Sequence, residues 1–250
     1  MAVSIKSARE IELMREAGKR LAHVHQELEA MITPGISTWE IDAKGEKLIR
    51  DCGCIPNFLH YNGYPASICV SVKDEVVHGI PRKDRYLKEG DIVSLDAGLI
   101  YKGYHSDAAR THAVGKVSTE AQKLMDVTKQ SFFEGIKMAK EGQHLHDISR
   151  AIEEYVTPYG YGIVRDLVGH GIGTALHEDP QIPNYAQKRR GVRLQAGMTL
   201  AIEPMINAGT WQVRFLRDGW TVVTKDGSLS AHYENTILVT DGEPEILTLY

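Results

Sequence analysis

The sequence has few cysteines and no extended block of basic residues. Three cysteines occur among 250 residues, Cys52, Cys54 and Cys69, and the CGC spacing fits neither a zinc knuckle nor a CxxC redox pair. We expect free thiols in a reducing compartment. The 29 basic and 33 acidic side chains give a formal net charge of -4, and the longest basic block is KRR at 188–190. This balance argues against the basic surface of a protein that binds nucleic acid.

The sequence also lacks a secretion signal and a membrane-spanning segment. The opening MAVSIKSAREIELMREAGKR carries a charge every few residues, and no apolar run reaches the ~20 residues that a span requires. We therefore expect a cytoplasmic protein that binds neither membranes nor nucleic acids. Apolar residues make up 42% of the chain, which is enough for a sizeable core, and no linker divides it. Residues 1–250 are expected to form a single domain.

Hydrophobic periodicity predicts helices in two pairs. The expected helices cover residues 7–31, 37–50, 119–140 and 145–157. Ser7 stands three residues before Glu10, the spacing of a capping box, and Ser37 or Thr38 can cap the second helix.

Segments rich in β-branched and apolar residues predict strands after each pair of helices. They cover 66–72, 91–100 and 104–114, and the pattern returns over about the last fifty residues. There, Asp-Gly pairs at 226–227 and 241–242 predict hairpin turns. The order suggests an α+β fold with two similar halves, although no residue-level repeat supports the division.

Four acids lie in or beside apolar strand segments: Asp96, Asp107, Glu203 and Glu234. Buried carboxylates are costly unless they are paired, hydrogen-bonded or bound to metal. If a two-residue turn, either Tyr101-Lys102 or Lys102-Gly103, joins the strands that carry Asp96 and Asp107, both carboxylates fall on one face. A three-residue loop without a bulge would separate them.

The four acids together indicate a metal site. Taken singly, each is more often an exposed or strand-end residue. Glu203 precedes Pro204, which favours an extended backbone before it, and Glu234 adjoins the apolar TILV. Four carboxylates with one or two histidines suit two divalent ions better than one tetrahedral zinc. Two such ions can activate water and polarise a carbonyl, the chemistry of peptide hydrolysis.

The glycine-rich segment VGHGIGTALHEDP, residues 168–180, supplies candidate histidines. Its third glycine comes one residue too early for a dinucleotide fingerprint, and no lysine follows as in a P-loop. The glycines instead allow tight bends, so that His170 and His177 can reach one cavity. Either histidine alone is more often a surface or satisfied core residue than a ligand.

Five segments carry a family resemblance, in this order: GYPASICVSVKDEVVHGIP, DIVSLDAGLIYKGYHSDAART, LVGHGIGTALHEDPQIPNY, GMTLAIEPM and HYENTILVT. Over nearly the whole chain they resemble type I methionine aminopeptidase, the compact bacterial form within peptidase family M24. The resemblance implies a pita-bread fold, with two pseudo-symmetric α+β halves in which helices cover an antiparallel sheet. It also implies a metal-dependent exopeptidase that removes the initiator methionine of nascent proteins when the second residue is small.

The resemblance assigns metal ligands position by position. Asp96 would chelate one ion, Asp107 and Glu234 would bridge both, and His170 with Glu203 would hold the other. The two ions would be Mn, Fe(II), Co or Zn. Relatives also bind a monovalent cation through backbone carbonyls, at positions that correspond to the vicinity of Lys73, Glu75 and Ser230.

The implied mechanism uses three further roles. Metal-held water would attack the scissile carbonyl, with Glu203 as general base and the substrate amine near Asp96. His177 would stabilise the oxyanion, and His78 would contact the substrate amide or the leaving amine.

The implied methionine pocket consists of Phe58, Tyr61, Tyr64, Cys69 and Trp220. Any of these aromatics alone would more often be ordinary core. Leu176 stands where a phenylalanine is common, which would widen the pocket. DAG at 96–98 replaces the more usual DVT. This replacement keeps the implied ligand Asp96 and changes the residues that follow it.

The expected partners are nascent polypeptides with an N-terminal methionine and the ribosomal exit region, and a monomer is expected. Two rival functions use the same fold. A Xaa-Pro aminopeptidase or prolidase shares the ligands but usually carries an extra N-terminal domain, and only about 95 residues precede Asp96 here. A non-catalytic binding protein is disfavoured because all five ligands and both flanking histidines are present.

Overall fold

The structure is a computed structural model that describes residues 3–249. Its helices are α1 (Ala8–Glu29), α2 (Thr38–Asp51), α3 (Thr119–Ile136) and α4 (Leu145–Val156), with short 3-10 turns at Tyr61–Gly63 and Thr157–Tyr159. Two predicted caps are confirmed. The Ser7 side chain accepts from the Glu10 N–H and the Glu10 carboxylate accepts from the Ser7 N–H. Ser37, rather than Thr38, caps α2 in the same way with Glu40.

The strands are β1 (Ile55–Pro56), β2 (Ile68–Val72), β3 (Glu75–Val77), β4 (Ile92–Tyr101), β5 (Tyr104–Ala113), β6 (Gly162–Ile163), β7 (Gly169–Gly171), β8 (Glu178–Ile182), β9 (Thr199–Ile202), β10 (Met205–Asn207), β11 (Val213–Phe215), β12 (Val222–Thr224), β13 (Ser230–His232), β14 (Glu234–Leu238) and β15 (Glu245–Ile246). A nine-stranded sheet has the order β1-β4-β5-β14-β9-β7-β8, with β2 beside β4 and β15 beside β14. Two three-stranded sheets have the orders β13-β10-β6 and β11-β12-β3.

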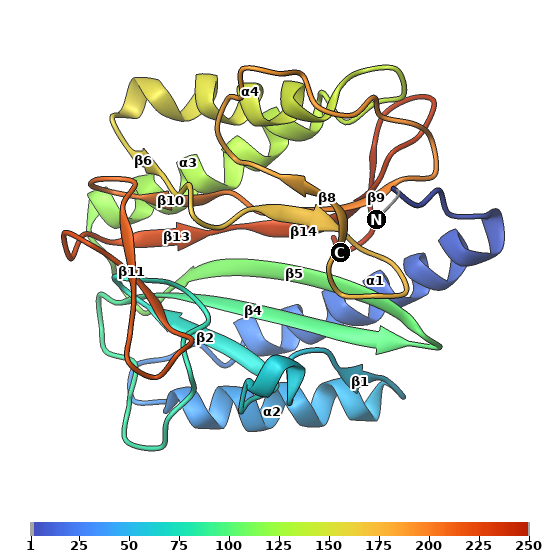
Figure 1. Ribbon diagram of the computed structural model, residues 1–250. Helices are drawn as coiled ribbons and strands as arrows, with labels where there is room; N and C mark the ends of the chain where they lie inside the picture. Colours follow the sequence, from blue (N-terminus) through green and yellow to red (C-terminus); the bar gives the residue numbers. More distant parts are fainter. Residues whose placement is uncertain (1–2, 250) are drawn as a thin grey trace.

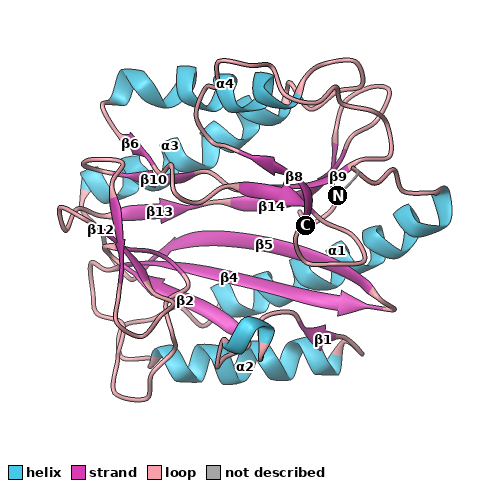
Figure 2. Cartoon of the chain, in the orientation of Figure 1, coloured by secondary structure: helices cyan, strands magenta, loops and turns pink. Residues whose placement is uncertain are grey.

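Each helix pair covers its own part of the sheet, so the chain has two α+β halves (Figure 1). The helices α1 and α2 bury a hydrophobic cluster against β2, β4 and β5. The helices α3 and α4 bury a second cluster against β9, β10, β13 and β14. Figure 2 shows the central strands running between the two helical layers. The expected order of elements is therefore confirmed.

Strand alternation turns the acids away from the helices. On β4, Val93, Leu95 and Ala97 join the core beneath α1, so the intervening Asp96 faces the other way. On β5, Ala108 joins that core and Asp107 does not.

The same alternation operates in the second half. Ile237 of β14 and Ile202 of β9 point into the core beneath α3. Glu234 and Glu203 lie an odd number of residues away from them, on the opposite face. All four acids thus share the face of the sheet that the helices leave uncovered.

The end of the third predicted helix and one predicted hairpin differ from the structure. The helix α3 ends at Ile136 instead of residue 140, because Met138 and Ala139 donate to carbonyls three residues back in a tighter turn. Asp226-Gly227 makes a turn but no hairpin, since the flanking strands belong to different sheets. Asp241-Gly242 does lie between two paired strands, β14 and β15. Between residues 3 and 249, no helix is both long and apolar enough to cross a bilayer.

Candidate metal centre and active site

All twelve residues predicted for the site line a single cavity of about 210 Å³, together with Asn62 and Leu176. Its lining combines four acids and three histidines with aromatic side chains, Cys69, Leu176 and Asn62. The site therefore combines side chains that can bind metal with apolar side chains.

The hairpin of β4 and β5 supplies the first two acids. Tyr101 pairs with Tyr104, which leaves Lys102-Gly103 as a two-residue turn. This is the second of the two predicted registers, and it places Asp96 and Asp107 diagonally on one face. Lys102 has a φ of 50° and Gly103 a φ of 87°, as expected for the turn that matches strand twist.

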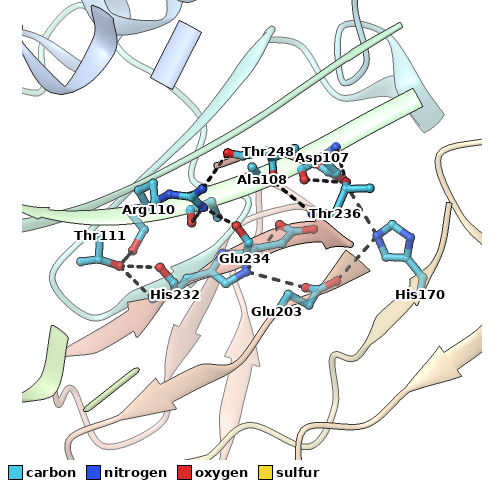
Figure 3. Close-up of polar contacts among 12 residues, drawn as sticks. Asp107, Ala108, Arg110, Thr111, His170, Glu203, His232, Glu234, Thr236 and Thr248 are labelled. Carbon is cyan, nitrogen blue, oxygen red and sulfur yellow. Dashed lines mark hydrogen bonds and ion pairs between the residues drawn. The ribbon is translucent and has the colours of Figure 1, made fainter. Parts of the chain in front are cut away.

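The neighbouring strand β14 brings Glu234 next to Asp107. Glu234 pairs with Ala109 of β5. Thr236 fixes this register, because its hydroxyl accepts from the Asp107 N–H at 3.0 Å and donates to the Asp107 carbonyl at 2.9 Å. The Arg110 guanidinium of β5 also donates to the backbone carbonyl of Glu234, which gives β14 a second link to β5 (Figure 3).

Glu203 lies at a break between two sheets. It follows β9 of the large sheet and precedes Pro204 and β10 of a small sheet. The Asn184 side chain donates to the Glu203 carbonyl at 3.1 Å. Because Pro204 has no N–H to continue the ladder, the chain changes sheets here and directs the Glu203 carboxylate into the cavity.

His170 faces the acids through one defined ring nitrogen. Its Nδ1 lies 2.9 Å from the Gly171 carbonyl, so Nδ1 carries the proton and donates. The lone pair of Nε2 then points at the carboxylates, 3.6 Å from Glu203 Oε1 and 3.9 Å from Asp107 Oδ2. Burial and the neighbouring His177 lower the pKa of His170 to about 3, so the ring is neutral at pH 7.

The donor atoms fit a divalent metal. One carboxylate oxygen each of Asp96, Asp107 and Glu234 is buried and has no hydrogen-bond partner within residues 3–249. Ligand atoms of Asp107, His170 and Glu234 all lie within 4.8 Å of one another. Two ligands about 2.1 Å from one ion are separated by about 3 to 4 Å, which matches the His170 distances. A cation would satisfy the orphaned oxygens that the protein leaves unpaired.

The electrostatics of the acids point the same way. Burial raises the pKa of Asp96 to about 7. Burial also raises the pKa of Asp107 well above its usual value, with further contributions from Glu234 and Asp96. The pKa values of Glu203 and Glu234 are raised by burial and by their acidic neighbours. Neighbouring carboxylates in a dry site repel one another, and positive charge between them would remove that repulsion.

His177 and His78 flank the acids. The His177 ring stands edge-on to His170 with 4.4 Å between ring centroids, and the Tyr61 hydroxyl lies 2.7 Å from His177 Nδ1. A phenol donates at neutral pH, so Nδ1 accepts and the proton of His177 lies on Nε2. Burial, and then His177, lower the pKa of His78 to about 4, which leaves it neutral as well.

The apolar end of the cavity is closed by packed aromatics. Tyr64 and Trp220 meet edge to face with 5.1 Å between centroids, and the Tyr64 hydroxyl donates to the Gly79 carbonyl at 2.9 Å. Leu176, Phe58 and Cys69 belong to the same hydrophobic cluster. Burial raises the pKa of Cys69 well above the usual thiol range, so it remains a neutral, apolar wall.

The loop that carries His177 is tied to the N-terminal segment. Glu178 accepts the N–H of Thr174 at 2.8 Å, and its other oxygen lies 2.6 Å from Lys6 Nζ. Ser4 donates to the same carboxylate at 2.7 Å. The Lys6 side chain is only 4% exposed, so this ion pair is largely shielded from water.

The positions expected near a monovalent cation are also close together. The Lys73 backbone has a φ of 64°, and its carbonyl accepts the Ser230 N–H at 2.8 Å. Glu75 is buried on the adjacent β3 and accepts the Val72 N–H at 2.8 Å.

Sequence reasoning missed two residues of the site. Asn62 lines the cavity but lies in a short turn with no distinguishing pattern. His232 is buried beside Glu203 and Glu234, with Nε2 3.8 Å from an oxygen of each. It stands two residues before Glu234, where the chain passes from β13 to β14, and this nearness in the sequence is a usable signal.

The chain is similar to known metallopeptidases over its full length. Residues 12–241 match metallopeptidase family M24. A methionine aminopeptidase of Clostridium acetobutylicum is 53% identical over 247 residues, covering 99% of both chains. The crystal structure of a methionine aminopeptidase from Thermotoga maritima superposes with a TM-score of 0.97 at 46% identity and covers 100% of both chains.

A more distant likeness concerns the fold alone. Prolidase from Pyrococcus furiosus aligns with a TM-score of 0.76 at 24% identity. That match covers 98% of this chain but 65% of the prolidase chain.

Proposed function

The chain belongs to metallopeptidase family M24, and from this premise we propose which of its residues perform the reaction. It is a metallo-exopeptidase with the pita-bread fold, and it removes N-terminal methionine. The observation that carries our assignment is the meeting of four carboxylates and His170 in one cavity, whose lining also includes several aromatic side chains.

We propose that Asp96, Asp107, His170, Glu203 and Glu234 hold two divalent ions. Four carboxylates and one imidazole accommodate Mn, Fe(II), Co or Zn. Bound there, the ions would supply Lewis acidity toward the scissile carbonyl and acidify water. The orphaned oxygens of Asp96, Asp107 and Glu234 support this assignment.

Three side chains handle protons and developing charge. Glu203, whose pKa burial raises, would take a proton from the attacking water on its carboxylate and pass it to the leaving amine. His177 would donate its Nε2 proton to the oxyanion, because Tyr61 occupies Nδ1. His78, neutral and beside Trp220, would hydrogen-bond the substrate amide and orient it.

The pocket formed by Phe58, Tyr61, Tyr64, Cys69 and Trp220 would enclose the methionine side chain. An apolar pocket discriminates by shape and burial, and it excludes water from the adjacent polar end. A small second residue would be preferred because a larger side chain would meet the wall. The substrates in the cell would be nascent chains in the cytoplasm, with the single domain of residues 1–250 acting as a monomer that docks near the ribosomal exit. A monovalent cation would bind near Lys73, Glu75 and Ser230.

The test is release of free methionine from a Met-Ala-Ser peptide. Protein stripped with a chelator should be inactive and should regain activity with Mn, Fe(II) or Co. Met-Leu-Ser should be a much poorer substrate, and Ala-Pro-Ala should not be cleaved. Cleavage of Ala-Pro-Ala instead would move the assignment to prolidase chemistry.

A matched pair of variants tests the metal ligands. Asp96→Asn should lose metal binding and activity together. Asp84→Asn, which changes an exposed aspartate paired with Arg82, should retain both. Full activity of the Asp96 variant would contradict the assignment.

A further inference from the structure

His232 is a buried imidazole that points at two of the acids. It ends β13, which pairs with β10 so that His232 lies opposite Met205. Its Nε2 lies 3.8 Å from Glu203 Oε2 and 3.8 Å from Glu234 Oε2 (Figure 3). The residue is 2% exposed.

The backbone holds this side chain in place while the ring remains unsatisfied. The Thr111 hydroxyl accepts the His232 N–H at 2.9 Å and donates to the His232 carbonyl at 2.8 Å. Neither ring nitrogen has a hydrogen-bond partner among residues 3–249. A separation of 3.8 Å exceeds a hydrogen bond, so the ring is not simply donating to the carboxylates. A fully buried imidazole with two unsatisfied nitrogens requires an explanation.

The two oxygens of Glu203 face two different histidines. Oε1 lies 3.6 Å from His170 Nε2, and Oε2 lies 3.8 Å from His232 Nε2. Ligand atoms of Glu203, His232 and Glu234 all lie within 4.8 Å of one another. These separations match donors that share one ion at about 2.1 Å. The second triplet thus has the same composition as that of Asp107, His170 and Glu234, with one imidazole and two carboxylates.

We propose that His232 is a sixth metal-ligating side chain, which binds through Nε2 together with Glu203 and Glu234. This inference rests on the proposed metal centre and adds a second imidazole to it. A second nitrogen ligand favours Co and Zn over Mn, because imidazole suits the later transition metals and oxygen ligands suit Mn. His232 would therefore tune which metal the site retains.

The deciding measurement uses the wild-type protein loaded with Co(II) alone. In the proton NMR spectrum, a coordinated imidazole contributes an exchangeable N–H signal with a large paramagnetic shift. Two such signals are expected, from His170 Nδ1–H and His232 Nδ1–H. One signal on a protein that binds Co(II) would overturn the assignment of His232 and leave the metal centre intact. Failure to bind Co(II) at all would instead contradict the proposed metal centre.

Variants assign the second signal and its effect on affinity. His232→Gln should remove one shifted signal and weaken Co(II) binding at least about tenfold, since even outer-sphere partners of ligands contribute about 10–100-fold. Mn(II) affinity should fall less. His112→Gln removes another imidazole, which lies half-buried on β5, and should change neither the signals nor the affinity. Persistence of both signals in the His232 variant would refute the proposal.

Discussion

Asp96 and Asp107 lie diagonally across the β4–β5 hairpin, where Asp107 faces Gly98 and Asp96 faces Ala109. The residue opposite Asp107 therefore has no side chain. Asn57 fills the space, and its amide donates to the Ser106 carbonyl at 3.1 Å. A Cβ at Gly98 would lie 2.5 Å from the Asn57 amide nitrogen and 3.1 Å from Asp107 Oδ1. The absence of a side chain at Gly98 thus leaves room for the Asp107 carboxylate.

We expect Gly98→Ala to destabilise the protein and weaken its metal binding. The added methyl would push Asn57 away and displace the Asp107 carboxylate, and such overpacking typically costs about 1–3 kcal/mol. Thermal unfolding and a Co(II) titration would measure the two effects. Combining the change with Asn57→Ala should restore part of both. If Gly98→Ala alone kept the wild-type melting temperature and Co(II) affinity, the close approach of residue 98 to Asn57 and Asp107 would be shown to be unimportant.

Asp107→Asn should have opposite effects on stability with and without metal. The folded-state pKa of Asp107 is raised by burial and by Glu234 and Asp96. The buried Asp107 carboxyl therefore lowers the free energy of unfolding by an amount that is zero below its unfolded-state pKa and complete above its folded-state pKa. The neutral amide of Asn does not ionise, so it removes this destabilisation. In chelator at pH 8 the variant should melt higher, by about 2–4 °C for each ~1 kcal/mol relieved. With saturating metal it should melt lower than wild type. A lower melting temperature in both conditions would contradict this reasoning.

Local patterns in the sequence predict much of this site, because acids within apolar strand segments are unusual. Asp96 and Asp107 interrupt apolar strands, and a two-residue turn was enough to put them on one face. The capping pairs that begin α1 and α2 are also recognisable in the sequence, since each depends on two residues that are only three positions apart.

The local sequence pattern does not predict which strands pair when they are far apart in the chain. Nothing near Glu234 specifies that β14 lies beside β5, or that β9 brings Glu203 next to His170. Those neighbours depend on cores built by distant helices. The approach of His232 to Glu203 is likewise long-range, because β13 and β9 are far apart in the sequence.

Metal affinity should rise with pH through the neutral range. Metal binds ionised carboxylates, whereas burial raises the pKa of Asp96 to about 7 and raises those of Asp107, Glu203 and Glu234. Binding near pH 6.5 must therefore displace protons, and affinity should fall about tenfold per pH unit for each proton displaced. His170, with a pKa of about 3, is already neutral and adds no proton.

Calorimetric titration at pH 6.5 in buffers of different ionisation enthalpy would count these protons. Wild type should release fewer protons at pH 8 than at pH 6.5, because more of the raised carboxylates are already ionised at the higher pH. A binding enthalpy that is independent of the buffer would mean that the carboxylates are already ionised.

Tyr61→Phe should slow catalysis through His177. The hydroxyl lies 2.7 Å from His177 Nδ1 and holds the proton on Nε2, where it can face the substrate oxyanion. Losing a hydrogen bond of about 1 kcal/mol predicts a fall in kcat of roughly fivefold, with a smaller change in KM. Tyr104→Phe is the matched control, since Tyr104 bonds Glu10 outside the cavity. Equal kcat values for the two variants would remove this role from Tyr61.

Lys6→Met should loosen the loop that carries His177 although Lys6 lies outside the cavity. The change leaves Glu178 buried without its cation, and breaking such a pair from one side costs about 3–5 kcal/mol when the pair is fully buried. Glu178 is 16% exposed, so we expect a somewhat smaller loss, together with a fall in kcat as His177 loses its fixed position. Chemical denaturation and methionine release measure the two effects. Adding Glu178→Gln should recover stability, because the amide no longer needs the cation. The exposed pair of Arg82 and Asp84 offers the control, since Arg82→Met should alter neither quantity. If Lys6→Met proved as neutral as that control, the N-terminal segment would have no part in holding the catalytic loop.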